Sequence, residues 1–177
     1  MAHEIQRQYC LDIRSKHPDY FVDKKVLDFG SLDINGNNRE LFSGGEYIGV
    51  DIGPGSNVDV VCLAHEYKTD VPFDTIISTQ MLEHDQYWQR SLTNMLILLK
   101  SGGLLLLHCA TNNFYVHGTK TSTPGDSPHT SKIDGWCDYY KNITEADIRS
   151  ILNPELNFTE YDFRIFHDDL GFYGIKF

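Results

Sequence analysis

Two turns in the first third of the sequence carry residue types that could bind a nucleoside. The run Gly30-Ser31-Leu32-Asp33-Ile34-Asn35-Gly36 follows an apolar stretch, and its two glycines let the backbone approach a ligand closely. Asp51 lies 23 positions beyond Asp28, at the end of a second apolar stretch. A carboxylate at that place can accept hydrogen bonds from both hydroxyls of an adenosine ribose. The alternative is that Asp51 only caps the turn Gly53-Pro54-Gly55.

Short β-rich stretches would position these turns. An amphipathic helix is expected at residues 3–14, where Ile5, Tyr9 and Ile13 recur at steps of four. The sequence predicts five strands in its first two thirds, at residues 25–29, 47–51, 58–62, 75–78 and 104–108. The last of them is almost wholly apolar, as expected for a strand that is buried on both faces.

Helices and a closing pair of strands complete the pattern. Apolar residues at three- and four-residue steps predict a helix that ends at Ser101-Gly102-Gly103. Thr144-Glu145-Ala146-Asp147 is typical of a capping box, and Asn153-Pro154 ends the helix that follows it. Residues 158–166 and 172–177 then alternate as two strands around a hairpin-like turn at residues 168–171. The chain is therefore expected to have an α/β fold.

One part of this pattern is unusually short. About six residues, 52–57, separate the second and third strands, whereas a parallel crossover usually takes a dozen or more. The next connection, residues 63–74, shows no helical period either. The helices around strands two and three are therefore expected to be reduced. The apolar face over the first three strands then needs cover, either from the N-terminal helix or from a second copy of the chain in a homodimer. The residues expected on this face are Val26, Ile48, Val50, Val58 and Val60.

Composition limits the classes of function. A length of 177 residues suits one domain, with residues 1–23 as an N-terminal helix and linker. The net charge of −10 argues against non-specific binding to nucleic acid or to an anionic membrane surface. The four cysteines form no CxxC pair, so no metal site is expected. No targeting segment and no long apolar run are visible, and a cytoplasmic protein is expected.

The order of several motifs resembles one enzyme family. Val26-Leu27-Asp28-Phe29-Gly30-Ser31 precedes Thr75-Ile76-Ile77-Ser78, which is followed by Met81-Leu82-Glu83-His84 and then by Leu99-Lys100-Ser101-Gly102-Gly103. This arrangement resembles class I S-adenosylmethionine-dependent methyltransferases, especially the small group with a Leu-Glu-His motif and a Lys-x-Gly-Gly turn. The likeness covers residues 24–110 well and the tail loosely. It implies a Rossmann-like, mostly parallel seven-stranded sheet with an antiparallel C-terminal strand and helices on both faces.

The resemblance also implies a cofactor and the residues that bind it. The cofactor would be S-adenosyl-L-methionine, with S-adenosyl-L-homocysteine as product. Glu83 would have a structural role in the first turn of a helix, favoured by the helix dipole, and His84 is not expected to be catalytic. Cofactor-binding residues are expected at the ends of the first four strands, namely Asp28, Gly30, Ser31, Asp51, Ile52, Ala64, His65, Ser78, Thr79, Gln80 and Met81.

The methyl acceptor would be bound by a long polar segment, residues 111–140. It is rich in Gly, Ser, Thr and Pro and also carries several aromatic residues, which favours a lid or substrate loop. His117 is the candidate general base, with Tyr139 or Tyr140 as a platform for the substrate. Each of these aromatic residues could instead simply anchor the loop to the body of the domain.

Missing motifs narrow the acceptor. Ser78–Met81 is not the Asp/Asn-Pro-Pro-aromatic motif of enzymes that methylate amino groups in DNA, and there is no Pro-Cys dipeptide for methylation of cytosine carbon. Ser78 also stands where metal-dependent relatives carry Asp. A small molecule, a sugar or a protein side chain remains as acceptor. The alternatives are a catalytically silent cofactor-binding module that partners another subunit, and a nicotinamide enzyme, which the lack of GxGxxG disfavours.

Overall fold

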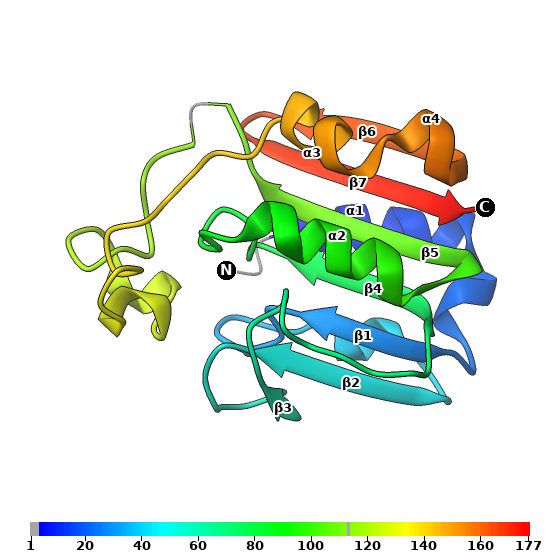
Figure 1. The fold of residues 1–177 in the computed structure, drawn as a ribbon, viewed down its shortest axis with the longest axis horizontal. Coiled ribbons are helices and arrows are strands. Elements are labelled where there is room, and N and C mark those ends of the chain that lie inside the picture. The colour runs from blue at the N-terminus through cyan, green and yellow to red at the C-terminus, as the bar shows by residue number, and fades with distance from the viewer. Residues whose placement is uncertain (1–3, 113) are drawn as a thin grey trace.

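The computed structural model describes residues 4–112 and 114–177, and its centre is a seven-stranded sheet (Figure 1). Residues 1–3, part of the expected N-terminal segment, and residue 113 of the expected loop lie outside this description. The strands are β1 (Lys25–Phe29), β2 (Glu46–Asp51), β3 (Val60–Val61), β4 (Phe73–Thr79), β5 (Leu99–Ala110), β6 (Phe158–Phe166) and β7 (Asp169–Lys176). Their order across the sheet is β3-β2-β1-β4-β5-β7-β6.

The direction of the strands confirms the expected fold class. β1 to β5 all run parallel to one another, whereas β7 runs antiparallel to both of its neighbours, β5 and β6. The sheet is thus Rossmann-like and mostly parallel, with an antiparallel strand near its C-terminal edge. No helix connects β2 to β3 or β3 to β4, so the helices in this half of the fold are reduced as expected.

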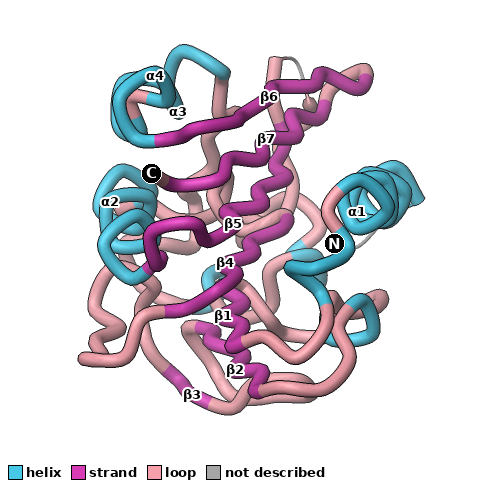
Figure 2. The backbone as a smooth tube through the Cα atoms, turned by 90° about the vertical axis from the view of Figure 1, so that its right-hand side faces the viewer, coloured by secondary structure: helices cyan, strands magenta, loops and turns pink. Residues whose placement is uncertain are grey.

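Helices cover both faces of the sheet (Figure 2). On one face lies α1 (Glu4–Lys16), and on the other lie α2 (Trp88–Leu98), α3 (Glu145–Leu152) and α4 (Pro154–Asn157). The α1 face contains one buried apolar cluster, and the α2 face contains a second, larger one. α3 begins at the expected capping box, because Thr144 accepts a hydrogen bond from the backbone N–H of Asp147 and the Asp147 carboxylate accepts one from the backbone N–H of Thr144.

Of the two alternatives expected to cover the sheet, the N-terminal helix or a second copy of the chain, the structure shows the first, because α1 packs on the sheet. Tyr9 and Ile13 are fully buried against the sheet, and the Tyr9 ring packs 5.7 Å from the ring of His108 in β5. Two short 3-10 helices, Pro18–Phe21 and Arg39–Leu41, extend the same layer over β1. The chain thus covers this face from its own N-terminal segment.

The expected grouping of apolar residues on that face was wrong in part. Val26 does pack with α1, but Ile48 and Val50 lie in the cluster on the α2 face. The register explains this, because Val26 pairs with Tyr47 and Leu27 with Ile48, and successive residues point to opposite faces. β3 is also shorter than predicted, and Val60 is 37% exposed rather than covered.

Further boundaries differ from the prediction. α2 ends at Leu98 and β5 begins at Leu99, so Ser101-Gly102-Gly103 lies within β5 rather than at the end of a helix. The final hairpin turns at His167 and Asp168, so β7 begins at Asp169 rather than at residue 172. More important for the site, α2 begins at Trp88, and residues 81–87 form turns instead of a first helical stretch. Glu83 therefore does not lie in the first turn of a helix, and the dipole role expected for it was wrong.

Truncation of Ile13 tests how much the docking of α1 stabilises the fold. Because Ile13 is buried between α1 and the sheet, Ile13→Ala should lower the free energy of unfolding by about 2–4 kcal/mol. Ile97→Ala is the matched control, since Ile97 is 69% exposed on α2 and its loss should change stability by no more than about 0.5 kcal/mol. Urea unfolding measures both values. Equal values for the two variants would show that α1 contributes little.

Candidate functional site

A cavity of about 920 Å³, its open mouth included, lies at the carboxyl ends of the parallel strands. Open α/β sheets bind ligands at this edge. The turns after β1, β2 and β4 form its walls, and the loop over residues 126–136 contributes to its rim. Figure 1 shows this loop, in yellow, beyond the ends at which the arrows of β1, β2, β4 and β5 point.

The turn after β1 depends on Gly30. Its φ of +81° lies in the region that favours glycine, and a Cβ added there would lie 2.5 Å from Cβ of Met81. The backbone N–H groups of Gly30 and Ser31 both donate to the carbonyl of Val50, at 2.9 and 3.2 Å. The turn is therefore held against β2 on one side and against the turn after β4 on the other.

Asp51 both caps its own turn and lines the cavity. Its carboxylate accepts hydrogen bonds from the backbone N–H groups of Leu32, at 3.2 Å, and Gly53, at 3.3 Å. The turn thus holds the carboxylate at the cavity wall, and the contact of Asp51 with a ribose stays a prediction. Burial raises the pKa of Asp51, although these backbone donors partly oppose the effect.

Asp28 is the most deeply buried carboxylate at the cavity wall. It accepts hydrogen bonds from the hydroxyl of Tyr47 at 2.5 Å and from the side-chain amide of Asn38 at 3.4 Å. Asn38 also donates to Oγ1 of Thr79, so Asn38 connects Asp28 with the end of β4. Burial raises the pKa of Asp28 to about 7 despite these donors.

Most of the predicted cofactor-binding residues line this cavity, but two do not. Those that line it are Asp28, Gly30, Ser31, Asp51, Ile52, Ala64, Thr79, Gln80 and Met81. Ser78 is buried outside the lining, where its hydroxyl donates to the carbonyl of Phe29 at 2.9 Å and ties β4 to β1. The ring of His65 packs against Tyr87, with 4.7 Å between ring centroids, and also lies outside the lining.

The sequence interpretation missed a large part of the rim. The residues that were not predicted include Gln6, Leu32, Asn38, Leu63, His84, Asp85, Trp136 and the run Asp126–Thr130. The run comes from the loop expected to be a lid, and Nε2 of His129 lies 3.1 Å from the carbonyl of Pro54 in the turn after β2. The loop composition indicated the segment, but nothing in the local pattern distinguished these positions from their neighbours.

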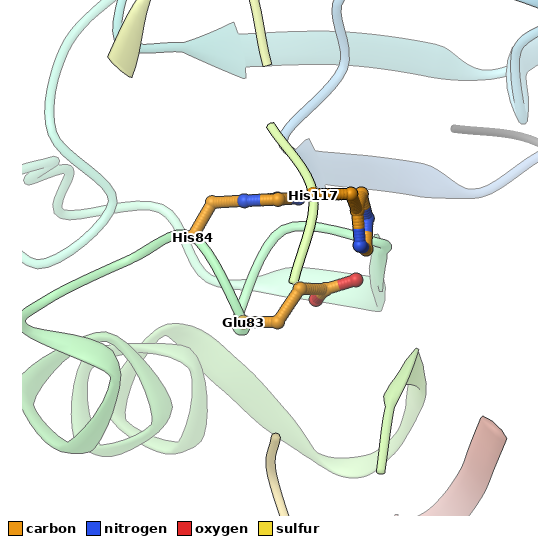
Figure 3. A group of neighbouring side chains, drawn as sticks. All are labelled: Glu83, His84 and His117. Atoms are coloured by element: carbon orange, nitrogen blue, oxygen red, sulfur yellow. The ribbon is translucent and has the colours of Figure 1, made fainter. Parts of the chain in front are cut away.

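Beside the cavity, the structure brings together three buried side chains, Glu83, His84 and His117 (Figure 3). The two histidine rings lie edge to face, with centroids 4.8 Å apart. Burial lowers the pKa of His84 to about 3 and also lowers that of His117, so both imidazoles are neutral at pH 7. His84 lines the cavity, whereas His117, the predicted base, does not.

Comparison with known sequences identifies the family. A family described as "Methyltransferase domain" matches residues 1–153 of this chain. The chain therefore belongs to the methyltransferase domain family, which confirms the resemblance seen in the motifs. A comparison with curated protein sequences finds no significant match.

Solved structures show the same fold at low sequence identity. An N1-methyltransferase of 1,6-didemethyltoxoflavin from Burkholderia thailandensis, with S-adenosylhomocysteine bound, is 13% identical at a TM-score of 0.63, over 96% of this chain and 77% of its own. The N-methyltransferase NodS from Bradyrhizobium japonicum, in complex with S-adenosyl-L-homocysteine, is 14% identical at a TM-score of 0.63. The match covers 98% of this chain and 88% of NodS. Magnesium protoporphyrin IX methyltransferase from Synechocystis, with S-adenosylmethionine bound, is 14% identical at a TM-score of 0.62. The match covers 100% of this chain and 86% of that protein.

A search for membrane-spanning helices gives a negative result. Within the described part of the chain, no helix is both long and apolar enough to cross a bilayer.

The raised pKa of Asp28 predicts a pH dependence of stability. An aspartate ionises near pH 4 when unfolded and near pH 7 in this fold, so the folded protein holds the extra proton between these values. Stability from the protonated carboxyl is therefore present below about pH 4 and is lost as the pH rises to about 7. The wild-type free energy of unfolding, relative to that of Asp28→Asn, should fall by up to about 4 kcal/mol over this range.

Urea unfolding of both proteins at a series of pH values measures this difference. The Asp28→Asn variant serves as the reference because the other titrating groups contribute to both proteins alike. A difference that stays flat from pH 4 to pH 8 would contradict the raised pKa.

Proposed function

We propose that the protein is an S-adenosyl-L-methionine-dependent methyltransferase in which residues 1–177 act as one catalytic domain. The observation that carries the proposal is the cavity at the carboxyl ends of β1, β2 and β4, formed by the Gly30 turn and the carboxylate of Asp51. Membership of the methyltransferase domain family and the shared fold with proteins that bind S-adenosylmethionine or S-adenosylhomocysteine support it.

The chemistry of the cavity fits the parts of this cofactor. Asp51 can accept hydrogen bonds from the ribose hydroxyls, while Ile52, Leu63 and Ala64 offer apolar and backbone contacts to the adenine. Thr79, Gln80 and Met81 would lie along the methionine half. The hydroxyl of Ser31, at the cavity wall, is buried without a hydrogen-bond partner among the described residues, as expected for a group that a ligand satisfies.

The bound cofactor would supply a methyl group on a positively charged sulfur, which is already a good electrophile. The protein then has to align the acceptor and exclude water rather than to activate the methyl group. The loop of residues 111–140 suits this task, because its residues form part of the cavity rim. As acceptor we propose a small molecule, a sugar or a protein side chain.

Asp51→Asn tests the ribose contact. Loss of the charged hydrogen bonds should weaken binding of S-adenosylhomocysteine by about 1.5–3 kcal/mol, or roughly ten- to 150-fold, while the amide keeps an oxygen for one of the two backbone donors. Isothermal titration calorimetry measures the affinity. Asp70→Asn is the matched control, since Asp70 is exposed and lies outside the cavity lining.

Unchanged affinity in Asp51→Asn would remove Asp51 from the ribose site. If the wild-type protein bound neither S-adenosylmethionine nor S-adenosylhomocysteine, the proposed function itself would fail. Binding without transfer to any acceptor would instead favour a catalytically silent module that partners another subunit.

Hydrogen exchange tests the loop as a lid. If it closes over bound ligands, amides in residues 114–135 should exchange more slowly with S-adenosylhomocysteine present, and more slowly still once an acceptor is added. Strand β6 is the internal control, because it lies at the far edge of the sheet and should not respond. Equal exchange of the loop in every state would show that it has a purely structural role.

A further inference from the structure

Glu83, His84 and His117 form a cluster that the proposed function leaves without a role. Glu83 and His84 come from the turn before α2, and His117 comes from the loop of residues 111–140. All three are buried, and one potential ligand atom of each lies within 4.8 Å of those of the other two. Figure 3 shows the carboxylate and the two rings meeting in one place.

The polar atoms of this cluster lack the partners that buried groups normally have. Within the described residues, both ring nitrogens of His84 and Oε2 of Glu83 are buried without a hydrogen bond. Nearly all buried polar atoms in proteins are paired, so three unpaired atoms on two adjacent residues indicate a missing partner. The hydroxyl of Tyr140, whose ring lies against both histidines, is also buried and unpaired.

His117 shows the orientation typical of a metal ligand. Its Nδ1 lies 3.1 Å from the carbonyl of Tyr115, and a histidine that binds a metal almost always places its other nitrogen on a carbonyl or carboxylate. The neighbouring Gly118, with φ of +64°, approaches His84 so closely that a Cβ there would lie 2.5 Å from Cε1 of the ring. The loop is therefore packed directly on the His84 side of the cluster.

We propose that Glu83, His84 and His117 bind one divalent transition-metal ion. Two imidazoles and one carboxylate suit Mn²⁺, Fe²⁺, Co²⁺ or Zn²⁺, and cysteine is not needed. Ligand atoms around one such ion lie at most about 4.4 Å apart, so small side-chain rotations would complete the site from the separations seen here. No metal site was expected from the sequence, because that prediction considered only ligands at short spacing. This cluster instead joins positions 34 residues apart.

The position of the site gives the ion a role in the proposed transfer, and this part rests on the proposed function. Three protein ligands leave coordination positions open, and one of the three, His84, also lines the cavity. An acceptor hydroxyl can bind there. Its oxygen would lose its proton to water and form a bond to the methyl carbon, while the bond from that carbon to sulfur breaks and leaves its electrons on sulfur. The acceptor class is therefore a hydroxyl compound.

Metal titration of the 177-residue protein tests the site. After treatment with a chelator, the protein should bind one Mn²⁺ per chain by electron paramagnetic resonance, and one Co²⁺ or Zn²⁺ by calorimetry. His117→Gln and Glu83→Gln should each weaken binding at least about tenfold. His167→Asn is the matched control, because His167 is an exposed histidine in the β6–β7 turn with a φ of +53° that asparagine accepts, and it should bind normally.

Binding of S-adenosylhomocysteine, measured on the same samples, separates this proposal from the proposed function. Normal binding of that ligand by the wild-type protein without stoichiometric metal binding would overturn the metal site alone. Metal affinity that is unchanged in both His117→Gln and Glu83→Gln would also overturn it. If either variant fails to fold by circular dichroism, the other decides.

The open coordination positions of the proposed ion are tested with the Mn²⁺-loaded protein. Water proton relaxation should show exchangeable water on the ion, and catechol, as a bidentate hydroxyl probe, should displace it. An ion that carries no exchangeable water, or that keeps its water when catechol is added, would overturn the role in acceptor binding.

Discussion

The parallel pairing of β1 with both β2 and β4 is the constraint on which the rest of the site depends. Phe29 pairs with Val50 on one side and with Ser78 on the other, so all three strands end at nearly the same level. The hydrogen bond from Ser78 to the Phe29 carbonyl fixes this level at the centre of the sheet. Three turns from distant parts of the sequence are thereby forced to meet at one edge, and the cavity lies between them.

A second consequence of that alignment concerns the turn between β4 and α2, where Asp85 sets the start of the helix. The carboxylate of Asp85 accepts hydrogen bonds from the backbone of Tyr87 at 2.8 Å and from the hydroxyl of Ser91 at 2.5 Å, and so takes the place of a helix cap. This delays the start of α2 to Trp88 and leaves residues 81–87 as turns. Met81 then faces the Gly30 turn, while Glu83 and His84 point away from the helix and toward the long loop.

The half of the sheet that contains β1, β2 and β3 is partly covered although few helices lie in this part of the fold. α1 and the two short 3-10 helices cover one face over β1 and β4, where Val26 and Ile77 are fully buried. On the edge, β3 consists of only two residues, both exposed. A short edge strand presents few unpaired backbone groups, which limits unwanted pairing with other chains.

The parallel class of the sheet followed from the resemblance to a known family, whereas the sequence by itself determined the order of the elements and the turns that carry Gly30 and Asp51. These features depend on local periodicity and on turn residues, and therefore can be derived from neighbouring positions. It did not determine that His65 packs on Tyr87, that Ile48 lies on the face opposite Val26, or that α2 begins seven residues after Met81. Only the tertiary structure decided these points and the meeting of Glu83, His84 and His117, because contacts between distant segments depend on strand register and on the path of a loop that has no regular period.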